Sequence, residues 1–320
     1  MNVFRKVSAV RRAAAVAMAA AMALSMAACG NGGASAGSSA AGSSQAAGSS
    51  AASEGSSAAG SEAAGEDVSG GDGTLTVAME CAYAPYNWTQ GDDSNGAVQI
   101  KDSKDYANGY DVMMAKKIAD ALGLKLEIVK SDWDSLVPAV QSGTVDCVIA
   151  GQSITADRLQ SVDFSDPYYY ATVVALTKKD SKYASAKGVK DLAGATVTSQ
   201  LNTIWYNNCL PQIPDAEILA AQESAPAMLM ALETGRVDAV VTDQPTAMAA
   251  TIAYPDMVML DFSKGGDDFQ VSDEDVNIGV SMKKGNTALK DKINEVLAAM
   301  TPDDYTEMMN EAISIQPLSK

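Results

Sequence analysis

Three side chains that could hold an anion follow a short apolar stretch near the middle of the chain. The stretch TVDCVIA is typical of a buried strand, and Ser153, Thr155 and Arg158 come soon after it. Ser and Thr suit the start of a helix, where free backbone amides favour a negative group, and arginine adds a planar grip with two donors. The pattern predicts a carboxylate or phosphate site. The alternative is that Arg158 lies on the surface and pairs with Asp157 or Asp163.

Other kinds of chemistry lack the residues they need. The chain has no histidine, which excludes Ser-His-Asp and Cys-His catalysis and most zinc sites. Cys81, Cys147 and Cys209 form no C-x-x-C pair, and their spacing does not tell whether two of them form a disulfide. Cys147 lies within the apolar strand pattern, so we expect a buried, inert thiol there. We expect no catalytic residue, no metal and no cofactor.

Strand-like and helix-like stretches alternate in the part of the chain that can fold. LTVAM (75–79) and LKLEIVK (124–130) have strand character, and GYDVMMAKKIADALG (109–123) has apolar residues at helical spacing. Residues 74–317 suffice for two modest domains. Alternation of this kind predicts an α/β fold with largely parallel sheets.

One phrase of the sequence occurs twice. VPAVQSGTVDCVIAGQSIT (137–155) aligns without gaps on LMALETGRVDAVVTDQPTA (229–247), and Gly151 falls opposite Asp243. Each copy reads as a helix ended by glycine, a Val-rich strand and a polar loop. Chance similarity between short units is the alternative, but two related domains explain the match better. Because ligands bind at the carboxyl ends of parallel strands, two such domains predict a shared cleft.

The first residues of the chain predict export and anchoring. Residues 1–12 hold four basic side chains and no acid, an apolar run follows over 13–26, and small residues precede Cys29. This order is typical of a secretory signal and resembles the lipobox of bacterial lipoproteins, in which the cysteine is lipidated, for example with palmitate. An ordinary signal peptide with a chance cysteine is the alternative. We expect a lipoprotein signal peptide over 1–28 and a protein held at the outer face of the cell membrane.

A flexible tether is expected after the cysteine. Residues 30–72 are almost entirely Gly, Ala and Ser, which cannot form a core and would reach roughly 35–40 Å as a random coil. We therefore assign 29–73 to the lipidated cysteine and a linker. Removal of the leader changes the net charge from −17 to −21, which disfavours nucleic acid and anionic lipid headgroups as partners.

Several motifs together resemble one family, the solute-binding proteins of polar amino-acid ABC transporters (bacterial extracellular solute-binding proteins, family 3), here in a lipoprotein form. The motifs are AYAPYNW, NGYDVMMAKKIADALG, SDWDSLVPAV, AGQSITADRLQSVDFSDPYYY and ETGRVDAVVTD, and the resemblance covers Thr74–Pro317. It implies a two-lobed periplasmic-binding-protein-like fold of type II, with two crossing strands at 168–179 and 276–285. Lobe 1 would be 74–175 plus 278–320, and lobe 2 would be 176–277.

The resemblance also implies roles for the ends of an amino-acid ligand. Arg158 and Ser153 match the residues that hold the α-carboxylate, with help from the backbone amide of Thr203. Asp243 matches the acid that takes the α-ammonium. The alternative role of Asp243 is to cap the helix that begins at Gln244, and both roles are compatible.

Five further positions carry over in the same way. Ala150 and Gly151 match backbone and small-residue contacts near the ammonium, and Tyr83 and Trp133 match the aromatic walls around the ligand side chain. Glu80 matches a loop position that can touch the far end of the ligand. Trp133 could instead anchor a helix to the core, and Glu80 could be a solvated loop acid.

Three features depart from the family pattern. Members often carry serine where this chain has Gly151, and a smaller residue where it has Asn202. The polar segment 89–108 is long and could form an additional lip on the cleft. For these reasons the sequence leaves the identity of the amino acid open.

The resemblance implies a binding protein that delivers an amino acid to the transmembrane subunits of an ABC permease. We expect a monomer, with a free amino acid, the permease and the membrane as partners and no nucleic acid. One alternative is a sensor that binds the ligand without transport. Another is a dehydratase-like enzyme on the same fold, which is disfavoured because an amino acid accounts for the charged residues expected in the cleft.

Overall fold

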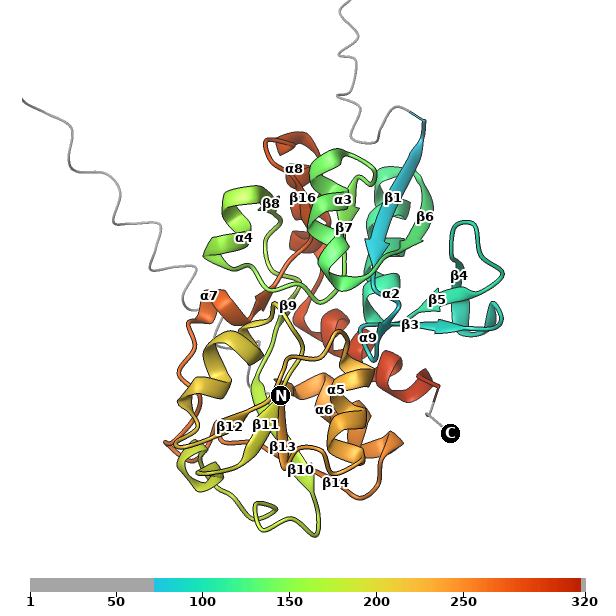
Figure 1. Cartoon of the computed structure of the whole chain (residues 1–320). Helices are drawn as coiled ribbons and strands as arrows, with labels where there is room; N and C mark the ends of the chain where they lie inside the picture. Colours follow the sequence, from blue (N-terminus) through green and yellow to red (C-terminus); the bar gives the residue numbers. More distant parts are fainter. Residues whose placement is uncertain (1–71, 318–320) are drawn as a thin grey trace, which may run out of the picture. The chain divides into compact units, whose positions relative to one another are not determined.

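The structure is a computed structural model that describes residues 72–317, except for the side chains of residues 273 and 274 (Figure 1). The predicted leader, Cys29 and the linker up to residue 71 lie outside the described residues. Within the described part of the chain, no helix is both long enough and apolar enough to cross a membrane.

The first large sheet contains five strands in the order β6-β1-β7-β16-β8. The pairs β1–β6 and β1–β7 are parallel, whereas β16 is antiparallel to both of its neighbours. The strands are β1 (Thr74–Met79), β6 (Lys125–Lys130), β7 (Cys147–Val148), β8 (Val162–Phe164) and β16 (Ser281–Lys283).

The second large sheet repeats this arrangement with the order β12-β11-β13-β10-β14. Strand β11 is parallel to β12 and to the central strand β13, and β10 is antiparallel to β13 and β14. The strands are β10 (Val173–Lys178), β11 (Thr196–Thr198), β12 (Glu217–Ile218), β13 (Ala239–Asp243) and β14 (Met257–Leu260). We call the first sheet with its helices lobe 1, and the second sheet with its helices lobe 2.

Two short antiparallel strands connect the lobes. β9 (Tyr169–Tyr170) pairs with β15 (Asn277–Ile278), and the chain continues from them into β10 of lobe 2 and β16 of lobe 1. The two predicted crossings are therefore confirmed. Each lobe receives its antiparallel strand from this crossing, so its sheet is mixed rather than wholly parallel. The lobe boundaries given above remain a prediction.

Helices pack against both sheets (Figure 1). In lobe 1, α2 and α3 contact strands of the first sheet, and in lobe 2, α5 and α6 contact strands of the second, whereas α9 contacts both α2 and α6. The helices are α2 (Tyr110–Leu122), α3 (Leu136–Ser142), α4 (Ala156–Ser161), α5 (Ala225–Glu233), α6 (Gln244–Ala253), α7 (Asp273–Val276), α8 (Thr287–Ala299) and α9 (Pro302–Ile315).

The repeated phrase of the sequence corresponds to a repeated structure, α3–β7 in lobe 1 and α5–β13 in lobe 2. Asp146 accepts a hydrogen bond of 2.8 Å from the Thr76 amide and returns one of 3.1 Å to the Thr76 carbonyl. Asp238 makes the same two bonds with Thr196, at 3.0 and 2.7 Å. The aspartate of the repeated phrase thus joins corresponding strands in the two lobes, β1 to β7 in lobe 1 and β11 to β13 in lobe 2. This correspondence supports two related domains.

A small sheet, ordered β2-β3-β5-β4, extends from the loop after β1. Its strands are β2 (Ala82–Tyr83), β3 (Asn87–Gln90), β4 (Val98–Gln99) and β5 (Tyr106–Asn108). It accommodates much of the long polar segment 89–108. The three described cysteines are buried and form no disulfide, as expected for Cys147.

Candidate functional site

Loops from both lobes enclose a small cavity. Lobe 1 contributes the loops after β1, β6 and β7 and the helix α4, and lobe 2 contributes the loop after β11. The cavity measures about 10 Å³, whereas one water needs roughly 10–15 Å³, so the lobes are closed upon each other. It is lined by Tyr83, Trp133, Gly151, Ser153, Arg158, Gln200, Thr203 and Trp205.

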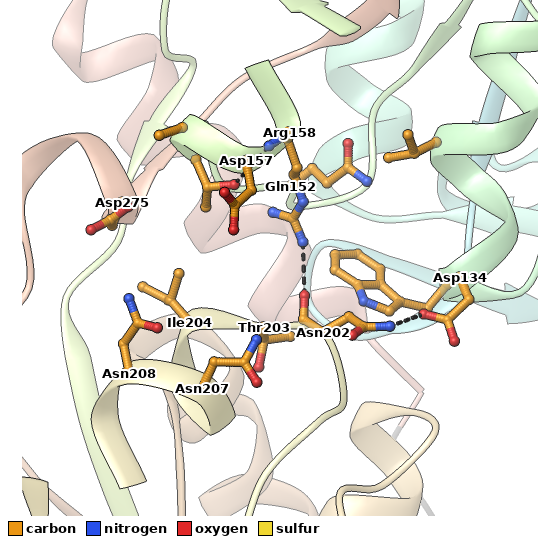
Figure 2. A pocket seen from close by; sticks show the side chains of 14 residues that line it. Asp134, Gln152, Asp157, Arg158, Asn202, Thr203, Ile204, Asn207, Asn208 and Asp275 are labelled. Atoms are coloured by element: carbon orange, nitrogen blue, oxygen red, sulfur yellow. Dashed lines mark hydrogen bonds between the residues drawn. The ribbon is translucent and has the colours of Figure 1, made fainter. Parts of the chain in front are cut away.

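The Arg158 side chain crosses from lobe 1 to lobe 2. Thr155 caps α4 by accepting the Arg158 amide at 3.3 Å, which places the side chain in the first turn of the helix. Its guanidinium donates to the Ser153 carbonyl at 2.9 Å and to the Asn202 carbonyl at 3.0 Å, and Figure 2 shows the second of these bonds. It also lies over the Trp133 ring, with 5.3 Å between the guanidinium carbon and the ring centroid.

No carboxylate within residues 72–317 forms an ion pair with Arg158. Asp163, one partner considered above, pairs instead with Lys284 at 2.8 Å. Burial lowers the pKa of Arg158 to about 10, so the group stays charged at neutral pH. Within the described residues, this cation therefore has two carbonyl oxygens and an aromatic ring as partners but no carboxylate.

Asp243 is the last residue of β13 and the N-cap of α6, and in the repeat it corresponds to Gly151 of lobe 1. Its carboxylate accepts hydrogen bonds of 2.9 Å from both the amide and the hydroxyl of Thr246, so it caps the helix as anticipated. The Tyr83 hydroxyl of lobe 1 donates to the same carboxylate. Asp243 is fully buried, which raises its pKa, and no cationic side chain of the described chain pairs with it.

Glu80 follows β1 and is buried rather than solvated, with 6% of its surface exposed. The Gln200 side chain of lobe 2 donates to its carboxylate at 3.3 Å. Desolvation, with a smaller contribution from the nearby Asp132, raises the pKa of Glu80 to about 7, although the hydrogen bond from Gln200 and the charge of Lys130 both lower it. Glu80 is thus a buried acid close to the cavity that can gain or lose its proton near neutral pH.

The backbone explains why position 151 is glycine. Gly151 has a φ of +63°, a conformation that side chains rarely adopt, and a Cβ there would lie 2.7 Å from a ring carbon of Tyr83. A serine at this position would therefore collide with Tyr83 in this closed structure. The preceding Ala150 is fully buried.

A larger groove of about 410 Å³ lies beside the cavity and shares Trp133, Arg158 and Thr203 with it (Figure 2). Asn202, which has a φ of +54°, donates from its side chain to Asp134 of lobe 1 at 2.7 Å. No residue of the segment 89–108 lines the cavity or this groove. Among residues 72–317, no group of three acidic or cysteine side chains could hold a metal ion.

Most of the predicted site residues converge. Six of them line the cavity, Glu80 and Asp243 bond to residues that line it, and Ala150 adjoins one. Sequence reasoning did not identify Gln200 and Trp205, although they lie three residues before and two residues after the predicted Thr203. Their nearness to Thr203 in a polar loop after a strand was the signal that could have found them.

Two mixed α/β lobes, joined by two strands and closed over a polar cavity, define a two-lobed binding protein of the solute-binding type. Residues 75–313 match the family model of the bacterial extracellular solute-binding proteins, family 3, and the chain belongs to that family.

Relatives and solved structures agree with this assignment. A probable histidine-binding protein of Neisseria gonorrhoeae is 32% identical over 223 residues, which cover 69% of this chain and 75% of that protein. An arginine-bound amino-acid ABC transporter substrate-binding protein of Streptococcus pneumoniae has a TM-score of 0.65 and 29% identity, covering 76% of this chain and 95% of its own. The ancestral amino-acid-binding protein AncCDT-1, a precursor of cyclohexadienyl dehydratase, has a TM-score of 0.61 and 32% identity, covering 75% and 96%.

Proposed function

We propose that this chain binds one amino acid between its lobes, outside the cytoplasm, and delivers it to the permease of an ABC transporter. The observation that carries the proposal is the pair of charges that lack a partner of opposite sign. Among the residues that the structure describes, no carboxylate pairs with Arg158 on lobe 1 and no cationic side chain pairs with the buried Asp243 on lobe 2. Buried charges are costly unless they are paired, and the two ends of an amino acid would pair both.

The contacts of the ligand follow from these positions. Arg158 would hold the α-carboxylate together with Ser153 and the backbone of Thr203. Asp243 would take the α-ammonium after the lobes reopen and the Tyr83 hydroxyl releases it. Ala150 and Gly151 would contact the α-ammonium through backbone and small-residue contacts, and Tyr83 and Trp133 would enclose the ligand side chain. This role for the nine predicted residues is supported by their convergence on one cavity.

The far end of the ligand would meet Glu80. A buried acid with a pKa near 7 favours a partner that brings a positive charge or several N–H donors. Relatives named for histidine, arginine and cystine bind amino acids with such groups. We therefore propose an amino acid with a basic or donor-rich side chain.

Anchoring is a separate part of the proposal. The pattern around Cys29 supports a lipid-anchored protein at the outer face of the membrane. We propose separately that the protein acts as a monomer. A single acyl chain anchors only marginally, so stable attachment needs a second chain.

An enzyme on the same fold is the second candidate, and one observation favours it. Glu80 is a buried acid with a pKa of about 7 beside the cleft, as a general acid or base would be. An enzyme would return an altered ligand, whereas a binding protein returns the same molecule. A sensor without transport would bind in the same way but leave uptake unchanged when the gene is deleted.

The decisive experiment is a thermal-shift screen of the twenty amino acids on the full-length protein, followed by mass spectrometry of the released ligand. A ligand at 100 times its Kd should stabilise the protein by about 2.7 kcal/mol. Matched controls are the decarboxylated and deaminated analogues of the best ligand, each of which lacks one of the two charged ends. Both should bind much more weakly. If none of the amino acids stabilises the protein, the proposal is wrong, and a chemically altered ligand would favour the enzyme.

A further inference from the structure

One fully buried carboxylate lies outside the cavity and the groove. Asp111, in the first turn of α2, has no exposed surface, and burial raises its pKa to about 7. Its two oxygens accept from different partners: the Tyr168 hydroxyl at 2.7 Å and the Asn87 side-chain amide at 2.8 Å. Each partner continues to one of the lobe 1 loops that reach the site.

The Tyr168 branch reaches the loop after β7. The Tyr168 hydroxyl accepts a hydrogen bond of 3.1 Å from the Gly151 amide, while its own proton points to Asp111. Tyr168 also comes directly before the hinge strand β9. This branch therefore connects the Gly151 loop, the hinge and Asp111.

The Asn87 branch reaches the loop after β1. The Asn87 side-chain oxygen accepts the Cys81 amide at 2.6 Å. Cys81 has a φ of +53° and lies between Glu80 and Tyr83, two proposed ligand residues. Because a non-glycine residue in this conformation is strained, its loop needs an outside contact to keep it in place.

We propose that Asp111 is the positioning residue of the binding site: it fixes both ligand loops of lobe 1 to each other and to the hinge without touching the ligand. The inference rests on the proposed function, since the loops matter only if they contact a ligand. The competing explanation is that Asp111 merely satisfies buried donors and stabilises the fold as a whole.

The balance of hydrogen-bond donors and acceptors around Asp111 suggests a variant that tests the proposal. In Asp111→Asn, two amides face each other, and no orientation of them satisfies the Cys81 amide, the Tyr168 hydroxyl and the contact between the amides together. One branch must break. The double variant Asn87→Asp with Asp111→Asn restores every bond, because the new carboxylate accepts from Cys81 and from the new amide, whose oxygen still accepts from Tyr168.

Two single variants separate the branches from general destabilisation. Tyr168→Phe removes the Gly151 branch and leaves the bond between Asn87 and Cys81 intact. Tyr110→Phe is the matched control: it removes an equally buried hydroxyl, which donates to the Tyr168 carbonyl at 2.9 Å, but neither ligand loop depends on that bond.

The experiment measures the amino-acid Kd by calorimetry and the thiol labelling of Cys81 by mass spectrometry, on the full-length protein. Cys209 of lobe 2 is equally buried and reports global opening. Asp111→Asn should weaken binding at least about tenfold, while the double variant and Tyr110→Phe should stay within about threefold of wild type. Cys81 labelling relative to Cys209 should accelerate in Asp111→Asn when the Asn87 branch is the one that breaks, and it should keep the wild-type ratio in Tyr168→Phe, in which that branch is intact.

Three results would overturn the inference: an Asp111→Asn variant that binds within about threefold of wild type with unchanged Cys81 labelling, equal weakening by Tyr110→Phe, or no rescue by the folded double variant. If the wild-type protein binds no amino acid, the proposed function fails instead. Accelerated labelling of Cys81 relative to Cys209 in Asp111→Asn then still shows that Asp111 fixes the loop after β1.

Discussion

Replacing Arg158 by alanine tests the proposed carboxylate contact most directly. In the closed structure Arg158 is partly buried, and two carbonyl oxygens accept hydrogen bonds from its guanidinium. Its loss would leave the ligand carboxylate shielded from water without a cation. Breaking such a pair costs on the order of 3–5 kcal/mol, which corresponds to a roughly 10²–10³-fold or greater loss of affinity.

Lysine at the same position separates charge from shape. Arg158→Lys keeps the positive charge but loses the planar fork, its bidentate geometry and the flat stacking over Trp133. Its affinity should fall between those of the wild type and Arg158→Ala. Calorimetry with the best ligand of the screen measures all three, and the thermal stability of the ligand-free variants shows that they are folded.

Arg158 also joins the lobes through the Asn202 carbonyl, so weaker closure has to be distinguished from a lost ligand contact. Asp134→Ala is the matched control, because it removes the other bond that Asn202 makes across the cleft and leaves the cavity untouched. A bond of this kind contributes about 0.5–1.5 kcal/mol, so this variant should lose no more than roughly tenfold in affinity. Equal losses in Asp134→Ala and Arg158→Ala, or an Arg158→Ala variant within about threefold of wild type, would refute the carboxylate contact.

Three further outcomes are expected. Folding raises the pKa of Glu80 from 4.5 to about 7, so the buried carboxylate destabilises the ligand-free protein progressively as the pH rises through that range. The difference in Tm between Glu80→Gln and the wild type should therefore grow in favour of the variant between these pH values. A difference that stays constant would contradict the burial of Glu80. Cys29→Ala should release the protein from membranes or leave it unprocessed, and normal retention of a correctly cleaved variant would exclude the lipid anchor. Solution scattering should show a more compact protein with ligand than without it, because a cavity of about 10 Å³ requires the lobes to separate before a ligand enters. Identical scattering profiles would argue against a hinge motion.

The helices and strands that are specified by the spacing of apolar residues could be predicted from the sequence. The helix at 109–123 and the strand at 124–130 were found within a residue of α2 and β6, because apolar spacing and a terminal glycine specify them. The mixed character of the sheets was not predicted. It depends on β10 and β16, which enter each sheet from the crossing between the lobes, and strand direction leaves no mark in the composition of a strand.

The same limit applies to the site. Arg158 was predicted from its residue type and its place soon after a strand, and Asp243 from the family resemblance and its place opposite Gly151 in the repeat. Asp111 was not, because a first-turn acid usually only complements the helix dipole, and its burial depends on Tyr168, 57 positions later in the sequence. Gln200 was missed because the strained backbone at Asn202 decides which side chains of that loop face the cavity.

The strand order has a consequence for how the protein is made. Lobe 2 draws all five strands of its sheet from one continuous segment, 173–260, whereas lobe 1 needs β16 at 281–283 to join β7 to β8. A chain synthesised from its N-terminus therefore completes the second sheet before the first, and β8 waits more than a hundred residues for its partner. Lobe 2 is thus an insertion within lobe 1, and the final segment, β16 with α8 and α9, is needed to complete lobe 1 after the insertion has been made.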